Sequence, residues 1–220
     1  KPGETTAIIG RTGSGKTALV GLIPRFYDVQ EGEVLVDGVN VKDYDRRTLR
    51  RKIGYVPQKA LLFKGTIMEN IRFGDDSASD ERVKEAAAIA QSTDFIEDKP
   101  DGFDSSISQG GSNVSGGQRQ RLAIARAIVR KPEIYVFDDS FSALDFKTDS
   151  ALRQALSKET GNATVVIVAQ RVSTIMNADR IIVMDEGKVM GIGTHRELLN
   201  TCGTYQEIVR SQLSEEEMSA

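Results

Sequence analysis

The chain has 220 residues, of which 39% are hydrophobic and 28% are charged, the composition of one globular domain with room for an inserted subdomain. Its 29 lysines and arginines against 32 acidic residues leave a net charge of -3, so nothing global favours nucleic acid or an anionic lipid surface as a partner. The longest strongly apolar runs, such as residues 165–169, are far shorter than the roughly 20 residues that a membrane-spanning helix needs. The single cysteine, Cys202, excludes an internal disulfide and fits a reducing compartment.

Short apolar runs of strand type alternate along the chain with stretches of helical spacing. The first run, Thr6–Gly10, has the length and flanks of a buried strand, and helical spacing follows over Lys16–Ile23 until Pro24 ends it. This alternation predicts an α/β fold with a mostly parallel sheet flanked by helices on both faces. Because the chain opens abruptly on the turn Lys1–Glu4, we expect further strands of the domain to precede it. The remaining strands are predicted at residues 33–36, 53–56, 134–138, 164–169 and 180–184.

In the middle of the chain the strand-type runs disappear and helical patterns replace them. Helices are predicted at Thr66–Ile71, Asp80–Ala90 and Gly117–Val129, and Ser79 stands where it can cap the second of these. We therefore expect residues 59–131 to form an inserted helical subdomain.

The C-terminal part returns to shorter elements. Residues 184–189 predict a hairpin whose turn contains Gly187, and two short helices are predicted at residues 194–199 and 204–213. The acidic residues 214–220 are expected to fray.

A glycine-rich segment, GRTGSGKT, follows the first predicted strand and opens the first predicted helix, which is the context that the P-loop pattern G-x-x-x-x-G-K-[ST] requires. Its glycines let successive backbone N–H groups point at one phosphate, and the helix adds the positive end of its dipole. Lys16 supplies charge to the outer phosphates, and the Thr17 hydroxyl can ligate Mg²⁺. A glycine-rich turn with a surface lysine is the alternative, but the full pattern seldom arises by chance. The predicted nucleotide-binding residues are Gly10, Arg11, Thr12, Gly13, Ser14, Gly15, Lys16, Thr17 and Ala18.

The predicted strand 134–138 ends in two aspartates, Asp138 and Asp139. Ligands of open α/β folds bind at the carboxyl edge of the sheet, where these side chains would lie. The pair suits a site in which Asp138 holds the outer shell of Mg²⁺ and Asp139 lies near the attacking water. Alone, it would better fit a strand that simply meets solvent, and the P-loop in the same chain favours the catalytic interpretation.

A second anion-binding pattern stands directly before the helical run 119–129. Ser115, Gly116, Gly117 and Gln118 would place a serine hydroxyl and glycine N–H groups at a helix N-terminus. Ser115 could equally be an ordinary helix cap. The spacing does not say whether this segment and the P-loop bind the same nucleotide.

Five motifs follow one another in the order GRTGSGKT, YVPQ at 55–58, NVSGGQ at 113–118, YVFDD at 135–139 and SALD at 142–145. This set resembles the nucleotide-binding domain of ABC transporters over essentially the whole chain, and SGGQ is the diagnostic signature because other P-loop ATPases lack it. The resemblance implies a head-to-tail dimer in which ATP and Mg²⁺ lie between the P-loop of one domain and the signature of the other. In that arrangement Ser115, Gly116, Gly117 and Gln118 bind the ATP of the partner.

The resemblance also assigns roles to further residues. Gln58 would be the Q-loop glutamine, which contacts Mg²⁺ and senses the membrane domain, although by itself it could be a solvated loop residue. The D-loop between the two sites would consist of Ser142, Ala143, Leu144 and Asp145. The stretch 62–71 is similar to exporters, in which it meets a transmembrane domain, here expected on the same full-length chain. Alternatively, Phe63, Ile67 and Ile71 are a core-facing stripe. The domain would lie at the cytoplasmic face of the cell membrane.

Two positions depart from the family pattern in the hydrolytic machinery. The family usually has glutamate where this chain has Asp139, which is one methylene shorter and reaches less far toward a water. The switch histidine is replaced by Gln170, whose amide can bond a phosphate but cannot carry charge or shuttle a proton. The one histidine, His195, is expected to pack or cap the helix that begins there. A third departure is Gln109, where exporters often have an acidic residue.

These departures beside an unaltered SGGQ resemble the degenerate half of a heterodimeric multidrug exporter. Its own site would bind Mg·ATP and hydrolyse it weakly. The catalytic positions of that site would be Lys16, Asp139 and Gln170, and the residues around the metal would be Thr17, Gln58 and Asp138. Its signature would complete the competent site of a second ABC subunit. The alternatives are a homodimer in which Asp139 hydrolyses slowly and a soluble ABC ATPase outside transport. The cargo expected from the family is a hydrophobic drug or lipid, and no residue is assigned to stack on adenine.

Overall fold

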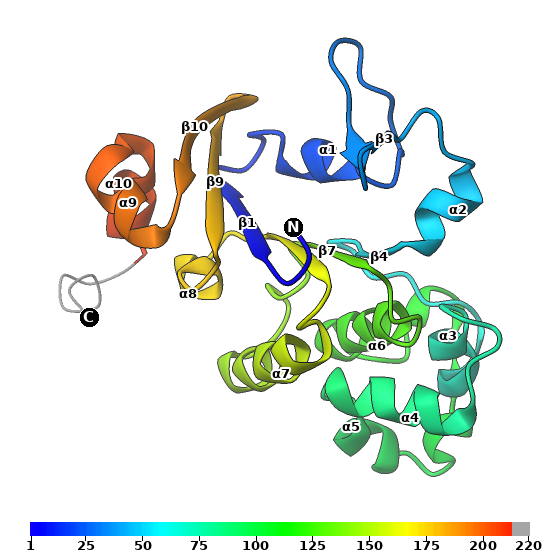
Figure 1. Ribbon diagram of the computed structural model, residues 1–220. Coiled ribbons are helices and arrows are strands. Elements are labelled where there is room, and N and C mark those ends of the chain that lie inside the picture. The colour runs from blue at the N-terminus through cyan, green and yellow to red at the C-terminus, as the bar shows by residue number, and fades with distance from the viewer. Residues whose placement is uncertain (213–220) are drawn as a thin grey trace.

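The computed structural model describes residues 1–212 and is built around one sheet of six strands (Figure 1). The strand order is β10-β9-β1-β8-β7-β4, and every neighbouring pair is parallel except β9 with β10. The mostly parallel sheet flanked by helices is therefore confirmed. The strands are β1 Thr5–Gly10, β4 Ile53–Val56, β7 Ile134–Asp138, β8 Thr164–Val168, β9 Arg180–Asp185 and β10 Lys188–Gly193.

The register of the central strands brings their carboxyl ends to one edge of the sheet. Asp138 of β7 pairs with Val168 of β8, and Val168 pairs with Ile8 of β1. Since parallel strands end together, the loops that follow β1, β7 and β8 start side by side. These three loops carry the P-loop, Asp139 and Gln170.

Side chains alternate between the two faces of the sheet, and each face has its own apolar core. On one face Ile8, Val136 and Val166 pack with the helices α1 Lys16–Gly21 and α2 Arg46–Arg51. On the other, Ile9 and Phe137 pack with the larger cluster that contains α6 and α7. Figure 1 shows α1 and α2 on one side of the sheet and α6 and α7 on the other. The bounds of these last two helices are Gly116–Ile128 for α6 and Phe146–Glu159 for α7.

The middle of the chain forms the helices that lie beyond α6 and α7 in Figure 1. Ser79 accepts the N–H of Arg82 and caps α4, as predicted, and Thr66 caps α3 in a capping box with Glu69. The boundaries 59–131 stay a prediction. The elements are β5 Gly65–Thr66, α3 Ile67–Arg72, α4 Asp80–Ile89, α5 Thr93–Glu97, β6 Ser106–Ile107, and 3₁₀ turns at Gly102–Asp104 and Gln109–Gly111.

The strand predicted at residues 33–36 does not join the main sheet, which corrects the sequence-based assignment. Only β2 Leu35–Val36 is formed, and it pairs with β3 Val39–Asn40 in a separate antiparallel hairpin. Asp37 and Gly38 between them both have positive φ, 51° and 76°, the conformation of a tight hairpin turn. This Asp-Gly pair was the sequence signal for a hairpin.

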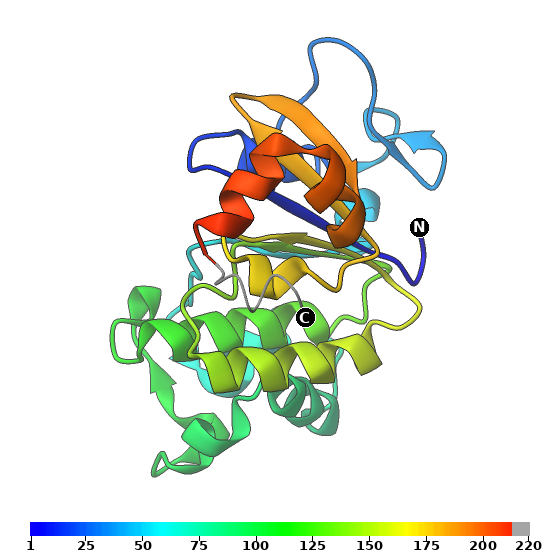
Figure 2. The same cartoon turned by 90° about the vertical axis from the view of Figure 1, so that its left-hand side faces the viewer.

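The C-terminal elements lie beside the edge of the sheet (Figure 2). The predicted hairpin is confirmed, with β9 and β10 joined at Glu186 and Gly187. The one histidine, His195, packs, as expected: its Nδ1 lies 2.8 Å from the hydroxyl of buried Tyr205, while Thr194 is the cap. The helices here are α8 Val172–Ile175, α9 His195–Thr201 and α10 Gly203–Arg210.

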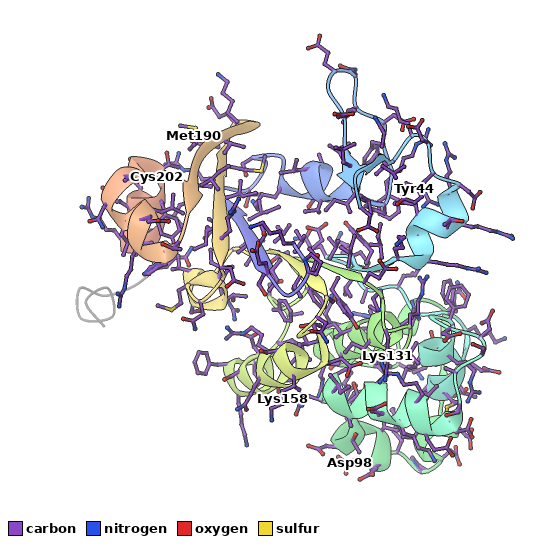
Figure 3. All side chains as sticks on the ribbon, viewed as in Figure 1. Tyr44, Asp98, Lys131, Lys158, Met190 and Cys202 are labelled. Carbon is purple, nitrogen blue, oxygen red and sulfur yellow. The ribbon has the colours of Figure 1, made fainter. Side chains whose placement is uncertain are left out.

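Cys202, labelled in Figure 3, is buried at the junction of α9 and α10, 3.8 Å from the carbonyl oxygen of Met190 on β10. Within residues 1–212 no helix has the length and apolarity that crossing a membrane requires. The predicted helix 204–213 ends at Arg210, and the fraying expected of residues 214–220 lies outside the described residues.

Candidate functional site

A cavity of about 270 Å³ opens at the carboxyl edge of the sheet. The P-loop, the YVPQ segment, the two aspartates at the end of β7 and the switch position all contribute to it, so residues far apart in sequence meet here. Its lining residues are Thr12, Gly13, Gly15, Lys16, Thr17, Ala18, Gln58, Asp138, Asp139, Val168 and Gln170.

The shape of the P-loop depends on its three glycines. At Gly10 an added Cβ would lie 2.1 Å from the carbonyl oxygen of Met184, so the backbone of β1 and β9 leaves no room for a side chain. Gly13 and Gly15 have φ of +83° and +94°, where other residues are strained. A Cβ on Gly13 would meet nothing within 4 Å, because this residue faces the cavity. The loop thus forms a cradle with backbone on its floor and open space above it.

Lys16 is buried at 9% exposure and lies folded against the P-loop. Its Nζ donates to the carbonyl oxygens of Gly10 at 2.8 Å and Arg11 at 2.9 Å. Burial lowers the pKa of the Lys16 ammonium, and the nearby carboxylates of Asp139 and Asp138 partly oppose that shift. The cradle therefore holds a partly desolvated positive charge where phosphate oxygens could approach.

Oxygen ligands for a divalent cation gather beside Lys16. The hydroxyl of Thr17 donates to Oδ1 of Asp138 at 3.0 Å, and the hydroxyl of Tyr55 donates to Oδ2 at 3.0 Å. A hydroxyl and a carboxylate at the end of a phosphate cradle are the donors that Mg²⁺ uses with nucleotides, so these residues fit that ion. Burial raises the pKa of Tyr55, and the charge of Asp138 raises it further, so the phenol stays protonated and keeps donating.

Asp139 is held by two side-chain amides that converge on the same oxygen. Nε2 of Gln58 donates to its Oδ2 at 3.0 Å, and Nε2 of Gln170 donates to it at 2.6 Å. The backbone of Asp139 is in the left-handed region, with φ of +48°, and its N–H donates to the carbonyl of Val168 at 2.9 Å. One carboxylate oxygen is thus fully engaged with neutral donors, neither of which can accept a proton from it.

The signature residues lie outside this cavity. Ser115 Oγ accepts the N–H of Gln118, Gln118 Oε1 accepts the N–H of Ser115, and the pair forms a capping box at the start of α6. Ser115 and Gly116 are exposed, and among the described residues that line the cavity none belongs to 115–118. The signature can therefore meet a ligand only from a direction other than the P-loop cavity of this chain.

The residues of the predicted D-loop lie next to the signature. A Cβ on Gly117 would lie 3.3 Å from the carbonyl oxygen of Ala143 and 3.7 Å from the side chain of Leu144. Ser142 donates through Oγ to the carbonyl of Asp139 at 3.0 Å, and Asp145 caps α7. This short segment links the aspartate of the cavity to the start of the signature helix.

The exporter-like stretch divides between core and surface. Ile67 and Ile71 are fully buried, whereas Phe63 is 37% exposed and lies 4.6 Å, centroid to centroid, from Phe73. The guanidinium of Arg126 lies over the Phe63 ring at 5.1 Å. The core-facing interpretation therefore holds for Ile67 and Ile71 but not for Phe63, and contact of this stretch with a transmembrane domain stays a prediction. Gln109 lies in the 3₁₀ turn that precedes the signature.

Tyr55 is the residue of the site that sequence reasoning missed. It stood inside a recognised motif, but no pattern indicated that its hydroxyl bonds Asp138. The pairing of Tyr55 with Val136 across β4 and β7 supplies the proximity, and that register is visible only in the sheet.

Comparisons with known proteins agree with this geometry. The family model for the ABC transporter matches residues 1–142. An uncharacterized ABC transporter ATP-binding protein of Mycobacterium tuberculosis is 50% identical over 215 residues, which are 96% of this chain and 37% of that protein. A Staphylococcus aureus protein provisionally named as a multidrug export ATP-binding/permease protein is 45% identical over 96% of this chain and 36% of its own length.

A solved structure gives the same result in three dimensions. The structure of a bacterial Atm1-family ABC exporter with ATP bound superposes with a TM-score of 0.94 at 39% sequence identity. The match covers 97% of this chain and 38% of that chain. The chain thus spans little more than a third of the length of the relatives that it matches.

Proposed function

Since the chain belongs to the ABC transporter family, we propose that it is the ATP-binding domain of an exporter whose own site binds Mg·ATP and hydrolyses it weakly. The P-loop cradle and the buried charge of Lys16 would bind the phosphates, and Thr17, Asp138 and Gln58 would hold the metal. When bound, Mg²⁺ would neutralise charge that develops on the phosphates.

The observation that carries the proposal of weak hydrolysis is the environment of Asp139. A general base must present a free carboxylate oxygen to its water and receive the proton of that water. Here Oδ2 already accepts two amide hydrogen bonds, so only Oδ1 is left to face such a water, on a side chain one methylene shorter than glutamate. Gln170, at the switch position, can donate to a phosphate oxygen but cannot relay a proton. The residues of this chain thus bind and orient the nucleotide better than they activate water.

The signature would act on a different nucleotide. Ser115 to Gln118 are exposed or partly exposed and separate from the P-loop cavity, which supports a head-to-tail pair in which they complete the site of a second ABC subunit. In this assembly the partner would contribute a site with glutamate and histidine at the positions that correspond to Asp139 and Gln170 of this chain. ATP binding would close the pair, and hydrolysis in the partner's site would reopen it.

The setting of the assembly is proposed from the relatives. The chain would be joined to a transmembrane domain and lie at the cytoplasmic face of the cell membrane, since it matches only 37% of the Mycobacterium tuberculosis relative and 38% of the chain in an exporter structure. The multidrug export in the name of the Staphylococcus aureus relative supports drugs as cargo.

The test is ATP turnover by this chain alone and then mixed with candidate partner subunits, with the variant Lys16→Ala giving the background. We expect turnover near background alone and a clear increase with the true partner. We also expect the double variant Asp139→Glu, Gln170→His to raise turnover of the chain alone by about tenfold or more, because a positioned base and switch are worth roughly 10²- to 10⁴-fold.

Brisk turnover by the unmixed chain that Asp139→Asn abolishes would contradict the proposal. That result would instead identify a homodimeric exporter domain in which Asp139 is a working base.

A further inference from the structure

The side chain of Gln212, two residues beyond the end of α10, grips the loop that follows β8 at two points. Its Oε1 accepts the N–H of Val172 at 2.8 Å, and its Nε2 donates to the carbonyl oxygen of Gln170 at 2.7 Å. The amide of Gln212 thus uses both its acceptor and a donor on the backbone of one three-residue segment. Two such bonds fix the position and the orientation of that segment together.

The backbone of residues 170–172 has few other polar contacts that fix its position. Helix α8 begins at Val172, and its N-cap residue, Arg171, makes no side-chain cap. The first N–H groups of a helix have no partner within the helix, so the N–H of Val172 needs an acceptor from elsewhere. Gln212, 40 residues away in sequence, supplies that acceptor.

This segment carries the side chain that reaches the active carboxylate. The side chain of Gln170, whose backbone carbonyl is bonded to Gln212, donates to Oδ2 of Asp139 at 2.6 Å. A chain of contacts therefore runs from Gln212 through the Gln170 backbone to Asp139 in the cavity. A shift of the loop would move the Gln170 amide relative to Asp139.

Helix α10 is itself well anchored, so it can serve as a fixed support. Its own residues Tyr205 and Val209 are fully buried. The helix also reaches the P-loop, where Arg11 pairs with Glu207 at 3.1 Å, but both side chains are 65% exposed and such pairs contribute little. The stronger link from this part of the chain to the site is the pair of hydrogen bonds that the Gln212 side chain makes with the loop.

We propose that Gln212 is a positioning residue that holds the switch loop so that the side chain at position 170 faces Asp139 and the outer phosphate. Because Gln212 bonds only backbone atoms of the loop, it serves whichever side chain occupies position 170. The proposal rests on the proposed function for the identity of the site, and it adds a residue outside the recognised motifs to that site.

The test compares Gln212→Ala and Gln212→Glu with the matched control Gln206→Ala in the full chain. Glutamate keeps the oxygen for Val172 but puts a second oxygen, in place of the donor, against the carbonyl of Gln170. Gln206 lies on α10 and donates through Nε2 to the carbonyl of Leu199 at 2.8 Å, so its loss also removes an amide hydrogen bond of this helix, away from the loop.

Single-turnover hydrolysis of labelled ATP, with protein in excess, measures the slow reaction of this site apart from ATP affinity. Both Gln212 variants are expected to slow hydrolysis at least about fivefold with the Kd for ATP changed less than about twofold, because the loop acts on the reacting groups and the P-loop is untouched. Gln206→Ala is expected to leave both quantities as in the parent chain. Hydrogen exchange at the Val172 amide is expected to accelerate in Gln212→Ala alone.

An unchanged rate in Gln212→Ala, or an equal loss in Gln206→Ala, would overturn the positioning role. Unchanged exchange at Val172 would also overturn it, and this measurement does not depend on hydrolysis. Brisk multiple turnover by the parent chain would refute the weak-hydrolysis proposal, but the comparison of the Gln212 variants would still decide the role of that residue.

Discussion

The two helix starts that sequence analysis marked as anion sites are built in opposite ways. Helix α1 begins after Gly15, which has φ of +94° and provides no side-chain cap, so its first N–H groups are not covered by a side chain of their own cap residue. Helix α6 begins after Ser115, which closes a capping box with Gln118. The first start lies in a cavity with a buried lysine, and the second is exposed.

This difference shows how one chain can carry two halves of two sites. The α1 start offers free donors and a charge, so it can bind a phosphate without any help from a partner. At the α6 start, Ser115 Oγ already accepts an N–H, but its hydroxyl proton is free to be donated outward. Such a start adds a hydrogen bond to an anion that is already held elsewhere, which fits a role in completing a partner's site.

The largest effect is expected from a side chain at Gly10, which would distort the floor of the P-loop cradle before α1. Gly10→Ala would bring a Cβ to 2.1 Å from the carbonyl oxygen of Met184, so β1 or β9 must move. We expect a loss of about 3 kcal/mol in the free energy of unfolding, the upper range for overpacking, together with loss of ATP binding. Denaturant unfolding and equilibrium binding of ATP measure the two quantities.

The matched variant at the other helix start is Gly116→Ala, where an added Cβ meets nothing within 4 Å. It is expected to leave ATP binding by this chain unchanged and to stabilise α6 by up to about 1 kcal/mol. Equal ATP affinities in Gly10→Ala and the parent chain would break the comparison, since the cradle would then tolerate a side chain.

The second effect separates the two starts by function in the assembled pair. Ser115→Arg is expected to lower ATP turnover by the pair about 100-fold or more, because it blocks the contact with the partner's nucleotide, a loss comparable with removal of a transition-state donor. Lys16→Ala weakens ATP binding at the site that hydrolyses little, so its effect on turnover is expected to be smaller. Steady-state turnover of the purified pair, with each variant in this chain only, measures both.

The control for assembly is co-purification of the two subunits, which must be equal for the two variants. Equal losses, or a larger loss with Lys16→Ala, would refute the division of roles between the helix starts.

The parts of the fold and site that the sequence predicted are those coded locally. The P-loop, the strand that ends in Asp138 and the cap at Ser115 each depend on a few adjacent residues, and the structure has them where they were expected. The hairpin at Asp37 and Gly38 was coded locally too, by an Asp-Gly turn signal that the strand prediction for residues 33–36 did not use.

The parts that sequence could not supply depend on long-range contacts. Tyr55 reaches Asp138 through the register of β4 on β7, and Gln212 reaches the switch loop from the turn after α10, 40 residues away from Val172. Neither residue type has a pattern that indicates its partner. The convergence of Gln58 and Gln170 on one oxygen of Asp139 likewise appears only when three loops meet.

The smallest expected effect is on the pH dependence of ATP binding, and it concerns the α1 start only. Burial lowers the pKa of Lys16 from its ordinary 10.5, and bound phosphate favours the protonated form. ATP binding is thus linked to proton uptake, so affinity is constant below the lowered pKa and falls roughly tenfold per pH unit above it. Lys16→Arg keeps a charge that does not titrate in this range and is expected to remove the dependence. Calorimetric titration with ATP between about pH 7 and pH 10 measures both chains, and an equal decline in Lys16→Arg would show that another group is responsible.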